Sequence, residues 1–201
     1  RDMAKNGAIS VENIKKLRVD HVGALRAPAP LRDLFEKRER GDVSEEDFIA
    51  AREAAIANII RKQEEIGLSV VTDGELRRRN FQDSFNAAVG GFSRPLAKGP
   101  GENVSGQPYS RTVSSGHNRW SVTEKLYLKQ NVPLEEFRLS AVTATCPIKV
   151  TLLSADRIAD QFDQSDTVYE DVDAFIADVV AIERTMIGEL IAAGRRYIQI
   201  D

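Results

Sequence analysis

The stretch Leu68-Ser69-Val70-Val71-Thr72-Asp73-Gly74-Glu75 decides the fold class of this chain. It opens with a short run rich in β-branched side chains, which is typical of a buried parallel strand. The polar triplet Asp73-Gly74-Glu75 follows directly at the carboxyl end of that predicted strand. Because α/β folds with parallel strands bind ligands beyond the carboxyl ends of those strands, the triplet is a candidate site.

Upstream of this strand, the sequence predicts one more strand and two helices. The apolar run 17–25 is closed by Pro28 and predicts a first strand. Residues 31–40 predict a short helix. Ser44-Glu45-Glu46-Asp47 then opens a longer helix as a capping box in its aspartate variant, and Gly67 supplies the left-handed stop.

Downstream, the pattern alternates again after one interruption. Residues 90–122 are rich in Gly, Pro, Ser and Asn and predict an inserted hairpin or loop excursion. A helix is predicted over 133–143, a strand over 148–153, a long helix over 172–191 and a strand over 197–201. The last strand ends on a carboxylate, Asp201.

This alternation of strands and helices predicts parallel βα units, arranged either as a barrel or as a doubly wound sheet. The Gly-rich turn of a nucleotide-binding sheet is absent from the sequence, which favours a (βα)8 barrel of the TIM type. We expect residues 1–18 to be an N-terminal extension. Residues 19–201 are then the N-terminal part of one barrel domain, incomplete in this chain.

The composition excludes several classes of function. The 201 residues carry a net charge of −3, which gives no field to attract nucleic acid or an anionic membrane. Cys146 is the only cysteine and cannot form an internal disulfide. No apolar run approaches the roughly 20 residues that span a bilayer. We therefore expect a cytoplasmic protein with a small-molecule partner, and neither a nucleic-acid nor a membrane partner.

Candidate site residues are those at the predicted strand ends. His21 lies in the first strand region, Asp73 and Glu75 follow the second, and Asp201 ends the last. Converging carboxylates could hold an ammonium group, orient a proton donor or ligate a metal. The alternative for the triplet is a plain turn, with Glu75 at the start of a helix where an anion meets the positive end of the dipole.

Other polar residues have competing interpretations. The run Arg77-Arg78-Arg79 predicts a solvated helix face, or alternatively an arginine that binds a substrate carboxylate. His21 is either a hydrogen-bonded core residue or a ligand or general acid, and His117 is expected to be exposed. Cys146 is expected to be a small packed residue. None of these residues stands at metal-ligand spacing, so the sequence assigns no metal.

Four ordered blocks of the sequence resemble the catalytic domain of the cobalamin-independent methionine synthase family, in its short single-barrel form. The blocks are 20–28, 64–67 leading to 71–78, 149–152, and 193–201. The resemblance implies a (βα)8 barrel that transfers a methyl group to a thiol such as homocysteine, with zinc activating the thiol as thiolate. It also implies that the zinc ligands follow Asp201 and are not in this chain.

The same resemblance implies roles for particular residues. The amino-acid end of the thiol substrate is expected at the turn of Gly23 and Ala24, at Glu75 and at Asp201, and Ala24 stands where the family has serine. The methyl donor stays open. The alternatives are another zinc-thiolate alkyl transfer, for example to an epoxide, or a non-catalytic half barrel. Partners are expected to be a thiol amino acid and a methyl donor, together with a second copy of the chain or the remaining barrel half.

Overall fold

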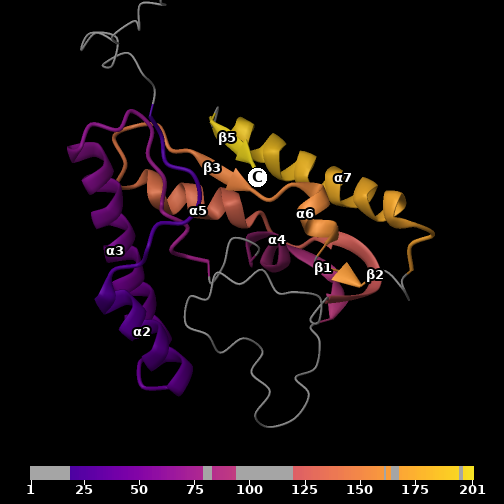
Figure 1. Ribbon diagram of the computed structural model, residues 1–201, viewed down its shortest axis with the longest axis horizontal. Helices are drawn as coiled ribbons and strands as arrows, with labels where there is room; N and C mark the ends of the chain where they lie inside the picture. The colour runs from indigo at the N-terminus through magenta and orange to yellow at the C-terminus, as the bar shows by residue number, and fades with distance from the viewer. Residues whose placement is uncertain (1–18, 79–82, 94–119, 161, 164–167, 195–196) are drawn as a thin grey trace, which may run out of the picture.

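The chain is an α/β structure with two small sheets (Figure 1). The computed structural model describes residues 19–78, 83–93, 120–160, 162–163, 168–194 and 197–201. The predicted extension at 1–18 lies outside these residues, and so do Arg79 and His117. One sheet has the strand order β1-β2-β4 and the other β3-β5, and a closed barrel is not seen among the described residues.

The first two described helices form where the sequence predicts them. α2 spans Ala29–Arg40, with a proline in its first turn and Gly41 in the left-handed conformation at its end. α3 spans Glu45–Glu65, and the Ser44 side chain accepts a hydrogen bond from the Asp47 amide at 3.0 Å. The capping box is therefore confirmed. Gly67, at φ 87°, confirms the predicted left-handed stop.

A parallel ladder carries the candidate site, and β3 (Val150–Leu152) lies at its centre. β3 pairs with β5 (Ile198–Ile200) in parallel, from Val150 opposite Ile198 to Leu152 opposite Ile200. On its other side, Ile148 forms a parallel bridge with Val71. The predicted strands at 148–153 and 197–201 are thus confirmed, and the predicted strand at 68–72 pairs at a single residue.

The predicted first strand is wrong for its described part, residues 19–25, which have no strand conformation. One backbone hydrogen bond ties this segment to its neighbour, from the Leu25 amide to the Gly74 carbonyl at 3.0 Å. Gln63 of α3 explains why the ladder stops there. Its side-chain amide binds both the carbonyl and the N–H of Thr72, at 2.7 and 3.0 Å, so these groups are not available to an adjacent strand.

The predicted excursion is a β-hairpin in the part that the structure describes. After α4 (Asp83–Ala88), β1 (Val89–Ser93) pairs antiparallel with β2 (Trp120–Leu128), and β2 pairs in parallel with β4 (Phe162–Asp163). The register shifts between Gly90 and Phe92. Gly91, at φ 107°, permits this bulge, because a Cβ atom there would lie 2.8 Å from the Lys125 carbonyl oxygen.

The remaining helices cover the second half of the chain. α5 spans Val132–Ala141, the short α6 spans Ala155–Ala159 and α7 spans Val172–Ala192. Asn131 caps α5 and donates through Nδ2 to the Met186 carbonyl of α7 at 2.9 Å, which joins the two helices. The predicted helices at 133–143 and 172–191 are therefore confirmed.

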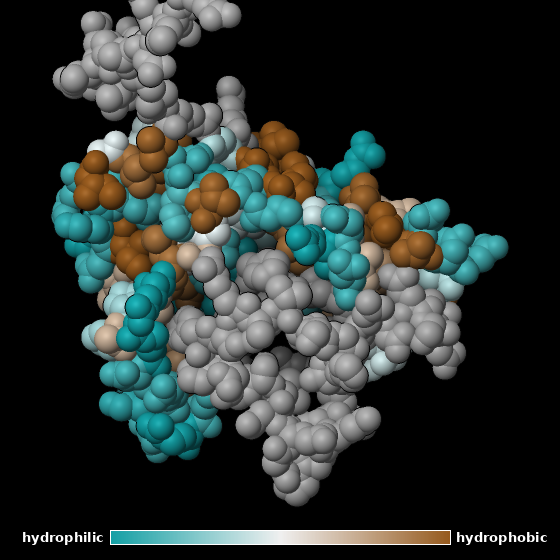
Figure 2. Space-filling model, in the orientation of Figure 1, coloured by the Kyte–Doolittle hydropathy of each residue, from teal (hydrophilic) through white to brown (hydrophobic). Residues whose placement is uncertain are grey.

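The outer surface over β5 and α7 carries apolar side chains among hydrophilic ones (Figure 2). Ile191 and Ile200 are 57% and 56% exposed. β5 has one strand neighbour among the described residues, so it lies at the edge of its sheet there. None of the helices in the described part of the chain has both the length and the apolar character that a membrane span requires.

Candidate functional site

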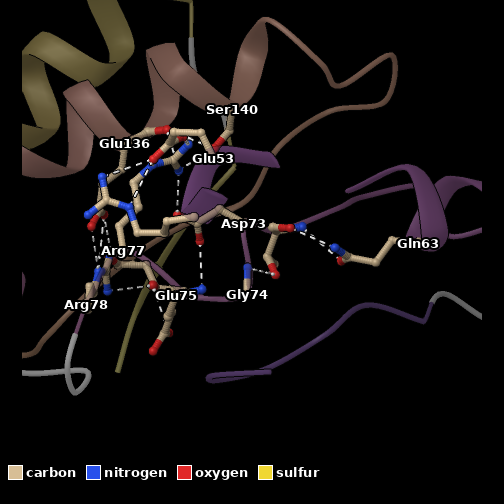
Figure 3. A network of polar contacts seen from close by, with 12 residues as sticks. Glu53, Gln63, Asp73, Gly74, Glu75, Arg77, Arg78, Glu136 and Ser140 are labelled. Atoms are coloured by element: carbon tan, nitrogen blue, oxygen red, sulfur yellow. Dashed lines mark hydrogen bonds and ion pairs between the residues drawn. The ribbon is translucent and has the colours of Figure 1, made fainter. Parts of the chain in front are cut away.

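A small cavity lies beside the turn 72–78, which follows the second predicted strand, and is also bounded by Gly23, by α5 and by residues 148–151 at the start of β3. Its volume of about 20 Å³ has room for a water molecule and little more. Figure 3 shows the polar side chains around it, which come from α3, from the turn and from α5. Three of the predicted site residues, Gly23, Asp73 and Glu75, line this cavity.

The turn after the second predicted strand has a tightly defined backbone. Asp73 Oδ1 accepts a hydrogen bond from the Glu75 amide at 2.9 Å, and the Gly74 amide donates to Thr72 Oγ1 at 3.1 Å. Gly74 has φ 70° and Glu75 has φ 56°. A left-handed conformation costs a non-glycine residue on the order of 1 kcal/mol, so the surroundings hold Glu75 in place. Residues 74–77 form a turn, as the plain-turn interpretation predicts, and no helix begins at Glu75 among the described residues.

Glu75 is a buried carboxylate of the site, with 6% of its surface exposed. Its Oε1 accepts a hydrogen bond from the Thr151 hydroxyl at 3.2 Å, whereas Oε2 is buried and has no hydrogen-bond partner in the structure. Burial raises the pKa of Glu75, and the charge of Arg78 and the Thr151 hydrogen bond oppose that rise. A buried acceptor without a partner favours a ligand that brings a donor or a positive charge.

Arg77 and Arg78, at the end of the turn, both form ion pairs with carboxylates of the protein. Arg78 Nη2 and Nε contact the Glu136 carboxylate at 2.6 and 3.1 Å, and both side chains are almost fully buried. Arg77 contacts Glu53 at 2.5 Å and Asp73 at 3.0 Å. The prediction of a solvated face is therefore wrong for both residues, because Glu53 of α3 pairs with Arg77 and Glu136 of α5 pairs with Arg78.

Lys149 ties the first turn to the last strand. Its side chain is 1% exposed, and Nζ donates to the His21 carbonyl and, at 2.9 Å, to Gln199 Oε1. Asp20 Oδ2 lies 3.7 Å from the same ammonium and accepts a hydrogen bond from the Tyr197 hydroxyl. These contacts hold the turn at Gly23 against the end of the ladder.

The remaining predicted site residues lie around the cavity without lining it. His21 has a buried Nε2 atom with no hydrogen-bond partner, Ala24 is exposed, and Gly23 between them has φ 78°. Asp201 is exposed at the end of β5, and its amide extends the ladder by donating to the Leu152 carbonyl at 2.9 Å. Its charge contributes to the raised pKa of Glu75, which places its carboxylate within electrostatic reach of the site.

A metal site is not present among the residues that the structure describes. No group of three or more His, Cys, Asp or Glu residues there could hold an ion. Cys146 precedes β3 and packs against the core, as predicted, and its amide donates to Glu64 Oε1 at 2.9 Å. The described residues therefore do not fit the zinc that the family resemblance implies.

Sequence reasoning missed the residues that surround Glu75, namely Glu136, Lys149 and Thr151. Lys149 gave the clearest signal, because a lysine within the apolar run 148–153 must be buried and therefore needs partners. Glu136 falls on the buried side of α5. No sequence signal connected it to Arg78, which lies 58 positions earlier in the chain.

The chain is similar in sequence to known proteins over most of its length. The chain is 27% identical to the uncharacterized protein YxjH of Bacillus subtilis over 92% of its own length and 47% of that protein. It is 30% identical to a methionine synthase of Pyrococcus abyssi and 29% identical to that of Pyrococcus horikoshii, over 90% of its own length and 50% of each relative. The chain thus spans about half the length of the curated relatives it matches.

Two solved structures share the fold. The B12-independent methionine synthase homologue of Listeria monocytogenes superposes with a TM-score of 0.69 at 24% identity, over 92% of this chain and 51% of that one. The B12-independent methionine synthase of Shewanella sp. W3-18-1, solved with selenomethionine, gives 0.59 at 20% identity over 80% of this chain and 44% of that one. The family model for the catalytic domain of cobalamin-independent synthase matches residues 21–201. The chain therefore belongs to the cobalamin-independent methionine synthase family, whose members are methyltransferases.

Proposed function

We propose that this chain binds the amino-acid end of a thiol amino acid such as homocysteine and orients it for S-methylation. Membership of the family and the relatives named methionine synthase support this reaction class. The chain spans about half of those relatives, and the proposal is that it supplies part of the site. The remaining barrel half, or a second copy of the chain, is thus part of the proposal.

The observation that carries the proposal is the free Oε2 atom of Glu75. It is a buried carboxylate oxygen beside a cavity, with no hydrogen-bond partner in the structure. An amino acid brings an ammonium group, which has three N–H donors and a positive charge. Placed against Oε2, this group satisfies the carboxylate and favours its ionised form. The negative charges of Asp73 and Asp201 also act on Glu75 and add to the attraction for a cation.

The substrate carboxylate is assigned to the first turn, at His21, Gly23 and Ala24. The obvious alternative partners, Arg77 and Arg78, already bind carboxylates of the protein. In the turn at Gly23, whose φ is 78°, the backbone can approach a ligand closely. In this arrangement the ammonium group contacts Glu75 and the carboxylate contacts the turn at Gly23.

In the reaction, the sulfur of the thiol forms a bond to the methyl carbon while the bond from that carbon to the donor breaks. The electron pair of the broken bond leaves with the donor, and the proton of the thiol passes to the departing donor or to solvent water. The described residues bind and orient the substrate in this step. They do not fit a zinc site, so no part of the proposal passes through a metal ion bound by them.

Calorimetric titration of the chain with L-homocysteine tests the proposal. We expect binding that Glu75→Gln weakens by about 10-fold or more, since a hydrogen bond to a charged group contributes roughly 1.5–3 kcal/mol. Glu65→Gln, the same chemical change at an exposed position at the end of α3, should leave the affinity unchanged. Equal affinities of the parent and Glu75→Gln would return Glu75 to a structural role.

The alternative reactions are separated by measuring thiol consumption with several donors in a preparation that contains both barrel halves. Consumption with a methyl donor supports the methyltransferase, and consumption with an epoxide alone indicates another alkyl transfer. A preparation that binds no thiol amino acid and consumes no thiol with any donor is the result expected of a non-catalytic half barrel.

A further inference from the structure

The hydroxyl group of Thr151 lies between Arg78 and Glu75, and both contacts are buried. Arg78 Nη1 lies 3.2 Å from Thr151 Oγ1, and Arg78 Nη2 donates to the Thr151 carbonyl at 3.1 Å. The same Oγ1 atom lies 3.2 Å from Glu75 Oε1. Thr151 is on β3, so these contacts connect the strand to the turn that follows the second predicted strand.

The direction of these two hydrogen bonds is determined by chemistry. An arginine guanidinium has donors and no acceptor, so Thr151 Oγ1 must accept from Arg78. The single hydroxyl proton of Thr151 then remains to be donated to Glu75 Oε1. Arg78 itself is held by the bidentate contact with Glu136, so it cannot turn away without breaking a buried ion pair.

This chain of contacts makes the two oxygens of Glu75 different. Oε1 accepts a hydrogen bond from the Thr151 hydroxyl group, and Oε2 accepts none. Resting on the function proposed above, we infer that Arg78 and Thr151 are positioning residues that orient the Glu75 carboxylate and reserve Oε2 for the ammonium group of the substrate. The backbone of Glu75 is left-handed, with φ 56°, and its side chain contacts Thr151 of β3.

Other charged groups also act on Glu75. Arg78 is positive and lowers the pKa of Glu75, Asp73 and Asp201 are negative and raise it, and Glu136 and Lys149 line the same cavity. A variant that tests the inference must therefore leave these charges in place. Thr151→Val does so, because it removes the hydroxyl group and keeps the shape of the side chain, and Thr151→Ser restores the hydroxyl without the methyl group.

The experiment measures two quantities for the parent, Thr151→Val and Thr151→Ser. The first is the pKa of Glu75, followed by the pH dependence of its ¹³C carboxyl resonance, which is assigned by its absence in Glu75→Gln. Loss of the donated hydrogen bond should raise this pKa by about 0.5–1 unit in Thr151→Val. The second is the dissociation constant for L-homocysteine, which should rise roughly 3- to 10-fold in Thr151→Val and less than about 2-fold in Thr151→Ser.

The outcomes separate this inference from the proposed function. If the Glu75 resonance of Thr151→Val titrates as in the parent, Thr151 does not orient Glu75 and the inference fails. If the resonance shifts as expected but the parent does not bind homocysteine, the proposed substrate and the role of Oε2 fail, and only the Thr151–Glu75 contact stands. Should Thr151→Val not fold, as judged by circular dichroism, Thr151→Ala removes the same hydroxyl group and the same two results decide the question.

Discussion

Replacing Glu183 by glutamine should stabilise the protein at alkaline pH and leave it almost unchanged at pH 5. Glu183 lies on the buried face of α7, together with Val179 and Met186, and 7% of its surface is exposed. Burial raises the pKa of this carboxyl group from 4.5 to about 7. The native state therefore binds more protons than the unfolded state between these two values, and stability falls as the pH rises across that window.

The magnitude follows from the size of the pKa change. At about 1.4 kcal/mol per unit, the full change from 4.5 to about 7 corresponds to at most roughly 3–4 kcal/mol. Residual contact with solvent reduces this cost, so we expect a stabilisation of about 1–2 kcal/mol in Glu183→Gln above pH 7.5. For a domain of this size that equals a rise in melting temperature of roughly 2–8 °C.

Urea denaturation of the parent and Glu183→Gln at pH 5 and pH 8 measures this effect directly. Glu65→Gln, at an exposed position, is the matched control. Its free energy of unfolding should differ from that of the parent by a similar amount at pH 5 and at pH 8. The reasoning is refuted if Glu183→Gln changes the free energy of unfolding by the same amount at pH 5 and at pH 8. That result would mean that Glu183 is as well solvated in the folded chain as in the unfolded chain.

Three further substitutions test the packing around the site by chemical denaturation. Glu136→Ala leaves the Arg78 guanidinium buried without its ion-pair partner and should cost about 3–5 kcal/mol, whereas a loss below about 1 kcal/mol would indicate a solvated pair. Tyr169→Phe leaves the buried Leu126 amide without its acceptor, 2.7 Å away, and should cost roughly 1–3 kcal/mol; no loss would mean that water replaces the hydroxyl. Gly91→Ala forces a Cβ atom against the backbone of β2 at a positive φ and should cost about 1–3 kcal/mol, and a neutral result would contradict the observed bulge.

Elements specified by neighbouring residues were predictable from the sequence. The cap at Ser44 and the left-handed stop at Gly67 depend on contacts within a few positions, and both are present in the structure. The apolar periodicity of 172–191 likewise predicted α7. The absence of a strand at 19–25 was not predictable, because it depends on the side chain of Gln63 binding the backbone of Thr72.

The same distinction holds for the candidate site. Glu75 was predicted because it follows a strand, and the structure places it beside the cavity. Its surroundings were not predictable, because the partners of Glu75 and Arg78 lie far along the chain. Thr151 is 76 positions from Glu75, and Glu136 is 58 positions from Arg78. A run of arginines has the same local pattern whether it faces water or buried carboxylates, so only the tertiary structure separates the two.

The central claim is that Glu75 recognises the ammonium group of a thiol amino acid, and a thermodynamic cycle tests it most directly. The four affinities are those of L-homocysteine and of its 2-hydroxy analogue, each for the parent and for Glu75→Gln. We predict that Glu75→Gln weakens the binding of homocysteine about 10-fold or more and the binding of the hydroxy analogue by less than about 2-fold. The coupling energy between Glu75 and the ammonium group is then roughly 1 kcal/mol or more. Equal weakening of both ligands, or of neither, would contradict the account.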